Sequence, residues 1–306
     1  MKQVLAFLIA MWSISSHAQS FDQLIHQADS LYDAGNHLAA GQAAEQAFNI
    51  QEGDAGQYYN AACSWALAGD TIKSLRFLDM SASKGYLNFD WMHKDKDLRS
   101  MHKLQGWQKI AAKVQANLDE YEKDFDKPLK TRLEKIQVKD QMLRQLYKDA
   151  EEKFGKDSEE MKYFWQLVSE QDSINEKEVI KIIDERGWPG KSLVGGKANM
   201  TVWLVIQHAP IETQEKYLPL LQESVKKGES QGNHLAMLED RIQMRNGKPQ
   251  VYGSQITTDP QTGQQVVYEI KDPEYVNQRR REVGLGPIQD YVKRWGIEWT
   301  VEQKER

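Results

Sequence analysis

His208 is the side chain in this sequence best suited to acid–base chemistry. It ends an apolar segment, residues 203–206, that is extended by Gln207 and closed by Pro210. If the segment is a helix, the partial negative charge at its C-terminus favours a protonated imidazole there. Such a histidine can act as a general acid or base near neutral pH, or it can cap the helix by bonding the last free carbonyl groups. The sequence leaves both roles open.

Asp240 and Arg241 are the second candidate pair, placed after the apolar residues 235–238. Neighbouring residues on a helix point about 100° apart, so the two charges face different surroundings. Arg241 could bind a ligand carboxylate or phosphate, while Asp240 could orient His208 or another polar group. In an enzyme, His208 would be the general acid or base, and Arg241 or Gln255 would stabilise developing negative charge. A structural ion-pair network explains the pair equally well.

Other polar side chains lie within otherwise apolar segments and could extend the same pocket. A buried polar group without a partner costs about 1–3 kcal/mol, so such groups must be paired or used. Asp140 is one helical turn from Arg144, which places both on one face, although a solvated surface is the alternative there. The candidate ligand-binding residues are Gln141, Arg144, Asp172, Gln207, Tyr252 and Gln255.

The sequence predicts no metal site and no cofactor. No His-Glu-x-x-His pair is present, and His208 and His234 lie on different predicted helices. Residues 190–192 resemble the end of a phosphate-binding loop, but Glu185 stands where the first glycine of that loop would be. Cys63 is the only cysteine, and its apolar neighbours indicate a packed thiol rather than a reactive one.

A mainly helical domain is expected to hold these residues. Three helices are predicted over residues 197–209, 213–227 and 233–245, and a helix-breaking proline or glycine follows each of them. Longer helices are predicted over residues 128–154 and 157–185, the second with a possible break at Ser173, which has capping-box spacing to Glu176. Alternating residues predict a β-hairpin at 249–271, and a further helix begins at Pro273.

The N-terminal half contains an internal repeat. Ala28-x-x-Leu31-Tyr32-x-x-Gly35 recurs as Ala62-x-x-Trp65-Ala66-x-x-Gly69, an offset of 34 residues that is typical of TPR helical hairpins. A third, atypical unit over residues 91–118 is expected to close the stack. Such a stack offers a concave surface for a protein or peptide partner, or it serves as a rigid spacer or dimer contact. The predicted fold is therefore mainly α: TPR-like repeats followed by a helical domain with one small β-hairpin.

The N-terminus has the pattern of a secretory signal. Lys2 precedes an apolar stretch, residues 4–14, that is too short to span a bilayer, and small residues predict cleavage after Ala18. We therefore expect a periplasmic or secreted protein without a stable membrane anchor. The net charge of −5 argues against nucleic-acid binding, which needs a basic surface.

The expected organisation is a signal peptide (residues 1–18), a TPR-like module (19–120), a charged linker (121–130) and a mainly helical domain (131–306). Four motifs of the last domain resemble a bacterial family catalogued as a domain of unknown function, whose members are often exported and sometimes carry a TPR-like module. They are Gly187-Trp188-Pro189, Val205-Ile206-Gln207-His208-Ala209, Leu238-Glu239-Asp240-Arg241-Ile242 and Tyr252-Gly253-Ser254-Gln255. The resemblance covers about residues 132–291. It implies that His208, Asp240, Arg241, Tyr252 and Gln255 converge, and it implies no particular activity.

These observations favour an exported binding or scaffold protein. The TPR-like module would engage a protein or peptide partner, and the C-terminal domain would hold a small ligand or a peptide end. The alternative is a metal-independent hydrolase or transferase of envelope material that uses His208. A third possibility is that the polar residues form a satisfied structural network.

Overall fold

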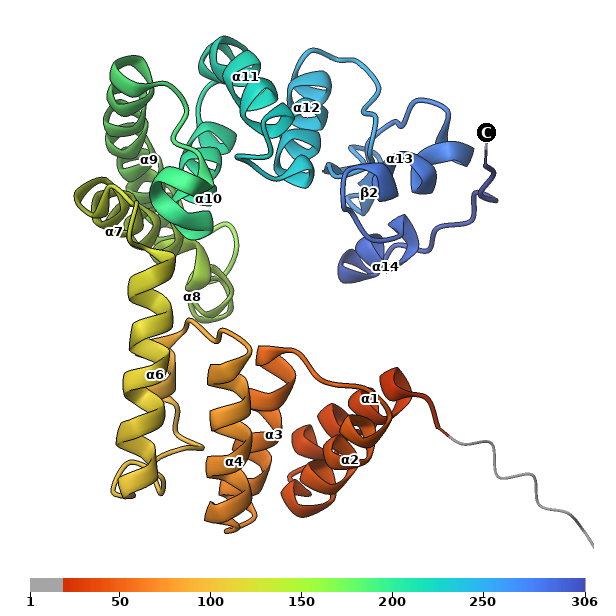
Figure 1. Cartoon of the computed structure of the whole chain (residues 1–306). Helices are drawn as coiled ribbons and strands as arrows, with labels where there is room; N and C mark the ends of the chain where they lie inside the picture. Colours follow the sequence, from red (N-terminus) through yellow and green to blue (C-terminus); the bar gives the residue numbers. More distant parts are fainter. Residues whose placement is uncertain (1–18, 306) are drawn as a thin grey trace, which may run out of the picture. The chain divides into compact units, whose positions relative to one another are not determined.

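The computed structural model describes residues 19–305, so the expected signal peptide lies outside the described residues. The chain forms two compact units that divide between Lys123 and Asp124 (Figure 1). Helices dominate each unit, and the strands described form one two-stranded antiparallel sheet. The prediction of a mainly α protein with one small β-hairpin is confirmed.

Two helical hairpins begin the N-terminal unit. Their helices are α1 (Phe21–Asp33), α2 (His37–Ile50), α3 (Ala55–Leu67) and α4 (Thr71–Ser83). A side chain caps the start of each helix, and the four caps are Ser20, Asn36, Asp54 and Asp70. The turn of each hairpin contains a glycine at positive φ, Gly35 at 76° and Gly69 at 85°, as the repeat predicted.

Small residues bring the hairpins into close contact. Gly41 on α2 lies against the indole of Trp65 on α3, and a Cβ at this position would come within 2.7 Å of that ring. Ala43, Ala44 and Ala47 are buried on α2. A third pair, α5 (Phe89–Lys94) and α6 (Gln105–Tyr121), adds residues such as Met92 and Trp107 to the same apolar core. The repeats thus share one core, as stacked helical hairpins require.

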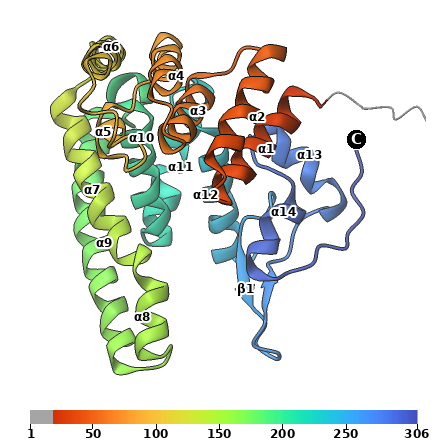
Figure 2. The same ribbon diagram turned by 90° about the horizontal axis from the view of Figure 1, so that it is seen from below.

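Three helices begin the C-terminal unit: α7 (Lys127–Gln145), α8 (Tyr147–Phe154) and α9 (Glu159–Arg186). The single helix expected over residues 128–154 is divided at Leu146, whose N–H donates to the carbonyl of Leu143 and tightens the turn. The helix α9 runs unbroken through Ser173, and Glu176 accepts a hydrogen bond from Thr213 instead of capping a new helix. The helices α7 and α9 lie side by side (Figure 2).

The next three helices complete the main core of this unit: α10 (Lys191–His208), α11 (Ile211–Lys226) and α12 (Gly232–Arg245). The helix α10 begins earlier than predicted because Gly195, at φ 80°, joins a short first turn to the main helix. A Cβ at Gly195 would come within 2.9 Å of the ring of Phe125. Leu133, Val202 and Leu238, from three different helices, are fully buried in this core.

A small ribbon and short helices close the chain. The strands β1 (Ile256–Thr258) and β2 (Gln265–Val267) are shorter than the predicted hairpin at 249–271, in which only Gln250 and Ile270 form a further bridge. After the ribbon come the 3-10 turn Pro273–Tyr275, α13 (Val276–Glu282), α14 (Ile288–Val292) and the 3-10 turn Lys293–Trp295. No helix within residues 19–305 is both long and apolar enough to cross a lipid bilayer.

Candidate functional site

His208 pairs with Asp140 and not with Asp240. Its Nδ1 lies 3.2 Å from Oδ1 of Asp140, which is on α7 with a side chain only 1% exposed. A carboxylate in this position accepts a hydrogen bond, so Nδ1 carries the proton and Nε2 is left for other partners. His208 itself remains 18% exposed. The orienting role that we expected for Asp240 therefore falls to Asp140.

Arg144 joins this pair to Asp172. Its Nη2 lies 2.7 Å from Oδ2 of Asp172, and its Nη1 lies 3.7 Å from Oδ2 of Asp140 and donates to the backbone carbonyl of Asp140. Gln141 also donates to Oδ2 of Asp140, at 2.5 Å. Burial alone would raise the pKa of Asp140, but the hydrogen bond and charge of His208, with Gln141 and Arg144, hold that pKa below its usual value.

Asp140, Asp172 and His208 also have the geometry of a possible metal site. One ligand atom from each lies within 4.8 Å of the others, and Oδ1 of Asp172 is buried without a hydrogen-bond partner. Imidazole and carboxylate ligands suit several divalent metals. Arg144 already forms ion pairs with both carboxylates, however, and its guanidinium would repel a cation at that place. The geometry therefore favours a hydrogen-bonded cluster.

Arginines from α12 meet the C-terminal end of α10 beside His208. Nη1 of Arg241 lies 3.3 Å from the carbonyl oxygen of Gln207, and Nη1 of Arg245 lies 2.9 Å from that of Ala209. Gln214 donates to the same Gln207 carbonyl at 2.8 Å. The side chain of Gln207 is buried, with Nε2 donating to Met237 O and Oε1 unpartnered. The predicted residues Gln207 and Arg241 thus adjoin His208.

Asp240 organises the loop before β1. Its Oδ1 accepts from the N–H groups of Val251 and Tyr252 at 2.7 and 2.9 Å, and its Oδ2 accepts from that of Ser254 at 2.9 Å. Asp240 is fully buried, and burial raises its pKa although the three amides oppose the rise. Because these amides point at a carboxylate, they cannot enter a strand ladder, which explains why the ribbon is short.

Tyr252 and Gln255 belong to this same network. The carbonyl of Tyr252 accepts from the fully buried Arg280 at 2.7 Å, and burial raises the pKa of the Tyr252 hydroxyl. Gln255 donates to Ser254 Oγ at 2.9 Å, while its own N–H bonds Gln250. Gln255 Nε2 also lies 3.5 Å from Met237 O, the carbonyl that accepts from Gln207, so Gln255 adjoins Gln207 as well as the loop, whereas Tyr252 serves the loop.

Gly187 and Trp188, from the first of the four motifs, line a second hollow of about 370 Å³, which Gly190 and Glu229 also line. The carboxylate of Glu229 accepts from the N–H of Ser192 at 2.9 Å, and this bond lowers the pKa of Glu229. An acidic side chain therefore already occupies the N-terminus of α10. This contact excludes the phosphate-loop interpretation of residues 190–192.

Comparison with protein families identifies this unit. A model described as a family of unknown function, DUF6624, matches residues 128–301. The chain belongs to the DUF6624 family. No curated protein and no solved structure matches the chain. The match covers the His208 cluster, Asp240 and its loop, and the arginines of α12.

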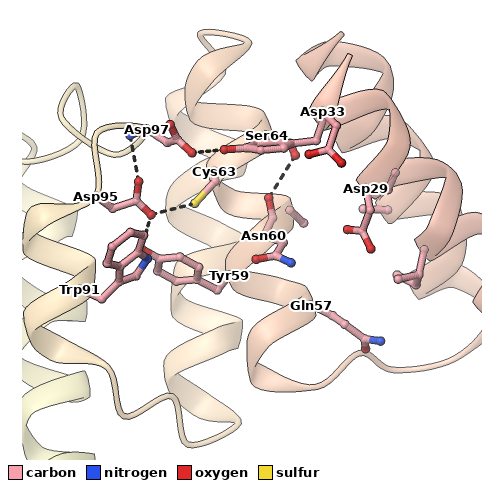
Figure 3. Close-up of a pocket in the computed structure, with 15 residues that line it drawn as sticks. Asp29, Asp33, Gln57, Tyr59, Asn60, Cys63, Ser64, Trp91, Asp95 and Asp97 are labelled. Carbon is pink, nitrogen blue, oxygen red and sulfur yellow. Dashed lines mark hydrogen bonds between the residues drawn. The ribbon is translucent and has the colours of Figure 1, made fainter. Parts of the chain in front are cut away.

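A groove in the unit that precedes the DUF6624 domain was not predicted as a specific site. It encloses about 600 Å³, and residues from α1, α3 and α5 form its walls (Figure 3). Its lining includes four carboxylates and three large aromatic side chains: Asp29, Asp33, Asp95, Asp97, Tyr32, Tyr59 and Trp91. The repeat could have indicated this surface, because Tyr32 belongs to the repeated motif and Asp29 and Asp33 occupy variable positions within it.

Hydrogen bonds fix the floor of this groove. Asp95 Oδ2 accepts from the hydroxyl of Tyr59 at 2.7 Å, and Asp97 accepts from the hydroxyl of Tyr32. Burial and these carboxylates raise the pKa of both tyrosines. Cys63 Sγ lies 3.7 Å from Asp95, and burial, with Asp95 and Asp97, raises the pKa of the thiol. The thiol therefore stays protonated, which disfavours both nucleophilic attack and metal binding by Cys63.

Proposed function

We propose that this protein is an exported binding protein whose N-terminal helical unit holds a lysine- or arginine-bearing segment of a partner. The observation that carries the proposal is the charge of the groove. Its lining includes Asp29, Asp33, Asp95 and Asp97 but no lysine, arginine or histidine. Like charges gathered on one concave surface repel one another, and a bound cation removes this cost.

The shape and walls of the groove favour a peptide over a small ion. A volume of about 600 Å³ suits several side chains. Trp91 lines the groove and is 53% exposed, whereas Tyr59, also in the lining, is 5% exposed (Figure 3). Such rings pack against the methylene stems of lysine and arginine and attract their charged ends. The surface formed by the first helix of each hairpin is also the usual partner surface of helical repeats.

Peptide binding by the mature chain tests this function. Fluorescence anisotropy should show binding of a labelled lysine-rich peptide that weakens as salt is added, because salt screens the exposed carboxylates. Replacing each lysine with norleucine removes the charge while keeping the stem, and it should abolish binding. The double variant Asp29→Asn with Asp33→Asn should weaken binding by roughly three- to tenfold, since exposed pairs contribute little each.

Asp79→Asn is the matched control for these variants. Asp79 lies on α4 outside the groove and is paired with Lys113, so its loss should leave peptide binding unchanged. Equal binding of the lysine and norleucine peptides, or equal binding by the double variant and the wild type, would contradict the proposal.

The pairing of His208 with Asp140 favours a second candidate function, hydrolysis or group transfer on envelope material. Asp140 would hold the imidazole by Nδ1, and Nε2 would accept or donate the reacting proton. Incubation with isolated envelope fragments, followed by mass spectrometry, tests this alternative. New products that disappear with His208→Gln would support it. Identical product spectra for the wild type and this variant would exclude it.

A further inference from the structure

Arg241 is a largely buried arginine whose charge has no carboxylate partner. Among the residues that the structure describes, no aspartate or glutamate forms a salt bridge with it, and its one hydrogen bond goes to the carbonyl of Gln207. Arg144, by contrast, is paired with Asp172 at 2.7 Å. Buried charges in proteins are ordinarily paired because desolvation costs several kcal/mol per ion. The unpaired Arg241 therefore needs an explanation.

Capping of α10 uses only one side of the guanidinium. Nη1 contacts the Gln207 carbonyl, while Nε is buried without any acceptor. The edge formed by Nε and Nη2 carries two parallel N–H donors. A carboxylate or phosphate group accepts from such an edge with two hydrogen bonds. The edge of Arg241 formed by Nε and Nη2 thus has the chemistry of an oxyanion site, although Nε is covered in this structure.

The charges around Arg241 point to the same ligand. Asp140 and Asp172 are the acidic members of the neighbouring cluster, and both already pair with Arg144 or His208. Arg245, one turn along α12, donates a hydrogen bond to the carbonyl of Ala209 and forms no salt bridge with a carboxylate among the described residues. Burial, Arg245 and Arg144 lower the pKa of Arg241. A bound anion would offset this excess of positive charge.

We propose that the DUF6624 domain binds an oxyanion, a carboxylate or phosphate group, on Arg241 at the C-terminal end of α10. Arg241 supplies the two-donor edge, and Arg245 adds positive charge. His208 lies at the same helix end, next to the Gln207 carbonyl that Arg241 contacts. This site lies in the C-terminal unit and does not depend on peptide binding by the N-terminal groove.

Titration of the full mature chain with simple anions tests the site. Inorganic phosphate and acetate serve as separate probes at constant ionic strength, with chloride as the reference, and binding is followed by calorimetry and by the shift in Tm. Saturable binding of phosphate but not acetate would assign a phosphate ligand, and the reverse would assign a carboxylate. Both results support the site. The absence of saturable binding by either anion would overturn it.

Variants locate the binding. Arg241→Gln should weaken it by about tenfold or more, and Arg241→Lys should restore only part of it because lysine lacks the planar two-donor edge. Arg245→Gln alters an exposed residue, should leave the fold intact, and should weaken binding by roughly two- to fivefold. Arg281→Gln is the control, since Arg281 is paired with Glu305. Unchanged affinity in both the Arg241→Gln and Arg245→Gln variants would place the anion elsewhere and refute the inference.

Discussion

Replacement of Asp240 by asparagine should destabilise the DUF6624 domain by about 2–3 kcal/mol. The asparagine oxygen can keep the hydrogen bonds from Val251 and Tyr252, now at 2.7 and 2.9 Å. Its NH₂ group would replace Oδ2 and face the N–H of Ser254, which now donates at 2.9 Å. A buried unpaired donor costs about 1–3 kcal/mol, and a hydrogen bond to a charged acceptor contributes about 1.5–3 kcal/mol. Burial raises the pKa of Asp240, because desolvation disfavours the charged carboxylate. In the wild type this desolvation offsets part of the stabilisation from the hydrogen bonds to that carboxylate.

Urea denaturation measures the total change, and hydrogen exchange locates it. The amide hydrogens of Val251, Tyr252 and Ser254 should exchange faster in Asp240→Asn than in the wild type. The exchange rates of amide hydrogens in the core of α10 should change only as far as the global stability changes. The same two measurements on the wild type provide the reference.

Asp259→Asn is the matched control for this variant. Asp259 also accepts two backbone N–H bonds, from Gln261 and Thr262, but it does so in an exposed turn where water can replace the carboxylate. The decrease in unfolding free energy caused by Asp259→Asn should therefore be smaller than that caused by Asp240→Asn. Equal losses for the two variants, or unaltered exchange at residues 251–254 in Asp240→Asn, would refute the argument that burial makes this network costly to break.

Two further predictions concern stability. His234 stacks on Trp203 with ring centroids 4.1 Å apart, and burial lowers its pKa from 6.5 to about 4. Between these two pH values the unfolded chain binds a proton at His234 and the folded chain does not. The stability that neutral His234 contributes to the folded state is therefore fully present above pH 6.5 and is lost as the pH falls towards 4. His234→Phe should remove about 2–3 kcal/mol of that dependence in urea denaturation at pH 7 and 4.5, and an unchanged slope would contradict this. Gly253→Ala should lower the stability by about 2–4 kcal/mol, because φ is 70° and a Cβ would lie 2.6 Å from the side chain of Ile288. Gly228→Ala has a similar φ of 73° but no atom within 4 Å of the added Cβ, so it should lower the stability by only about 1–2 kcal/mol. Comparable thermal shifts for the two alanine variants would contradict the steric part of the argument.

The sequence predicted those parts of the fold that depend on local chemistry. Gly35 and Gly69 end the first helices of the two hairpins because each adopts a positive φ, and this requirement is visible in the repeat. The ribbon was predicted too long for an equally physical reason. Alternating residues indicate strands, but they do not show that Asp240 draws the amides of Val251 and Tyr252 away from the ladder.

The candidate site depends on contacts between distant residues, which explains why the sequence predicted only part of it. Asp140, Arg144 and Asp172 were chosen for their types and helical spacing, yet the contact of Asp140 with His208 joins residues 68 positions apart. Asp240 was nearer in sequence and equally suitable by type, and only the packing of α7 against α10 decides between the two. The acidic groove likewise joins α1 to the segment after α5, as in the bond between Tyr32 and Asp97.

The burial of Cys63 makes it a reporter on one half of the molecule. Cys63 is the only cysteine among the 306 residues. It lies in the core of the first unit, and the residue is 4% exposed. A thiol reagent should modify it slowly, because burial, with Asp95 and Asp97, keeps the sulfur protonated and largely covered. Because Cys63 also lines the groove, a peptide held there should slow its alkylation in native buffer in proportion to the occupancy.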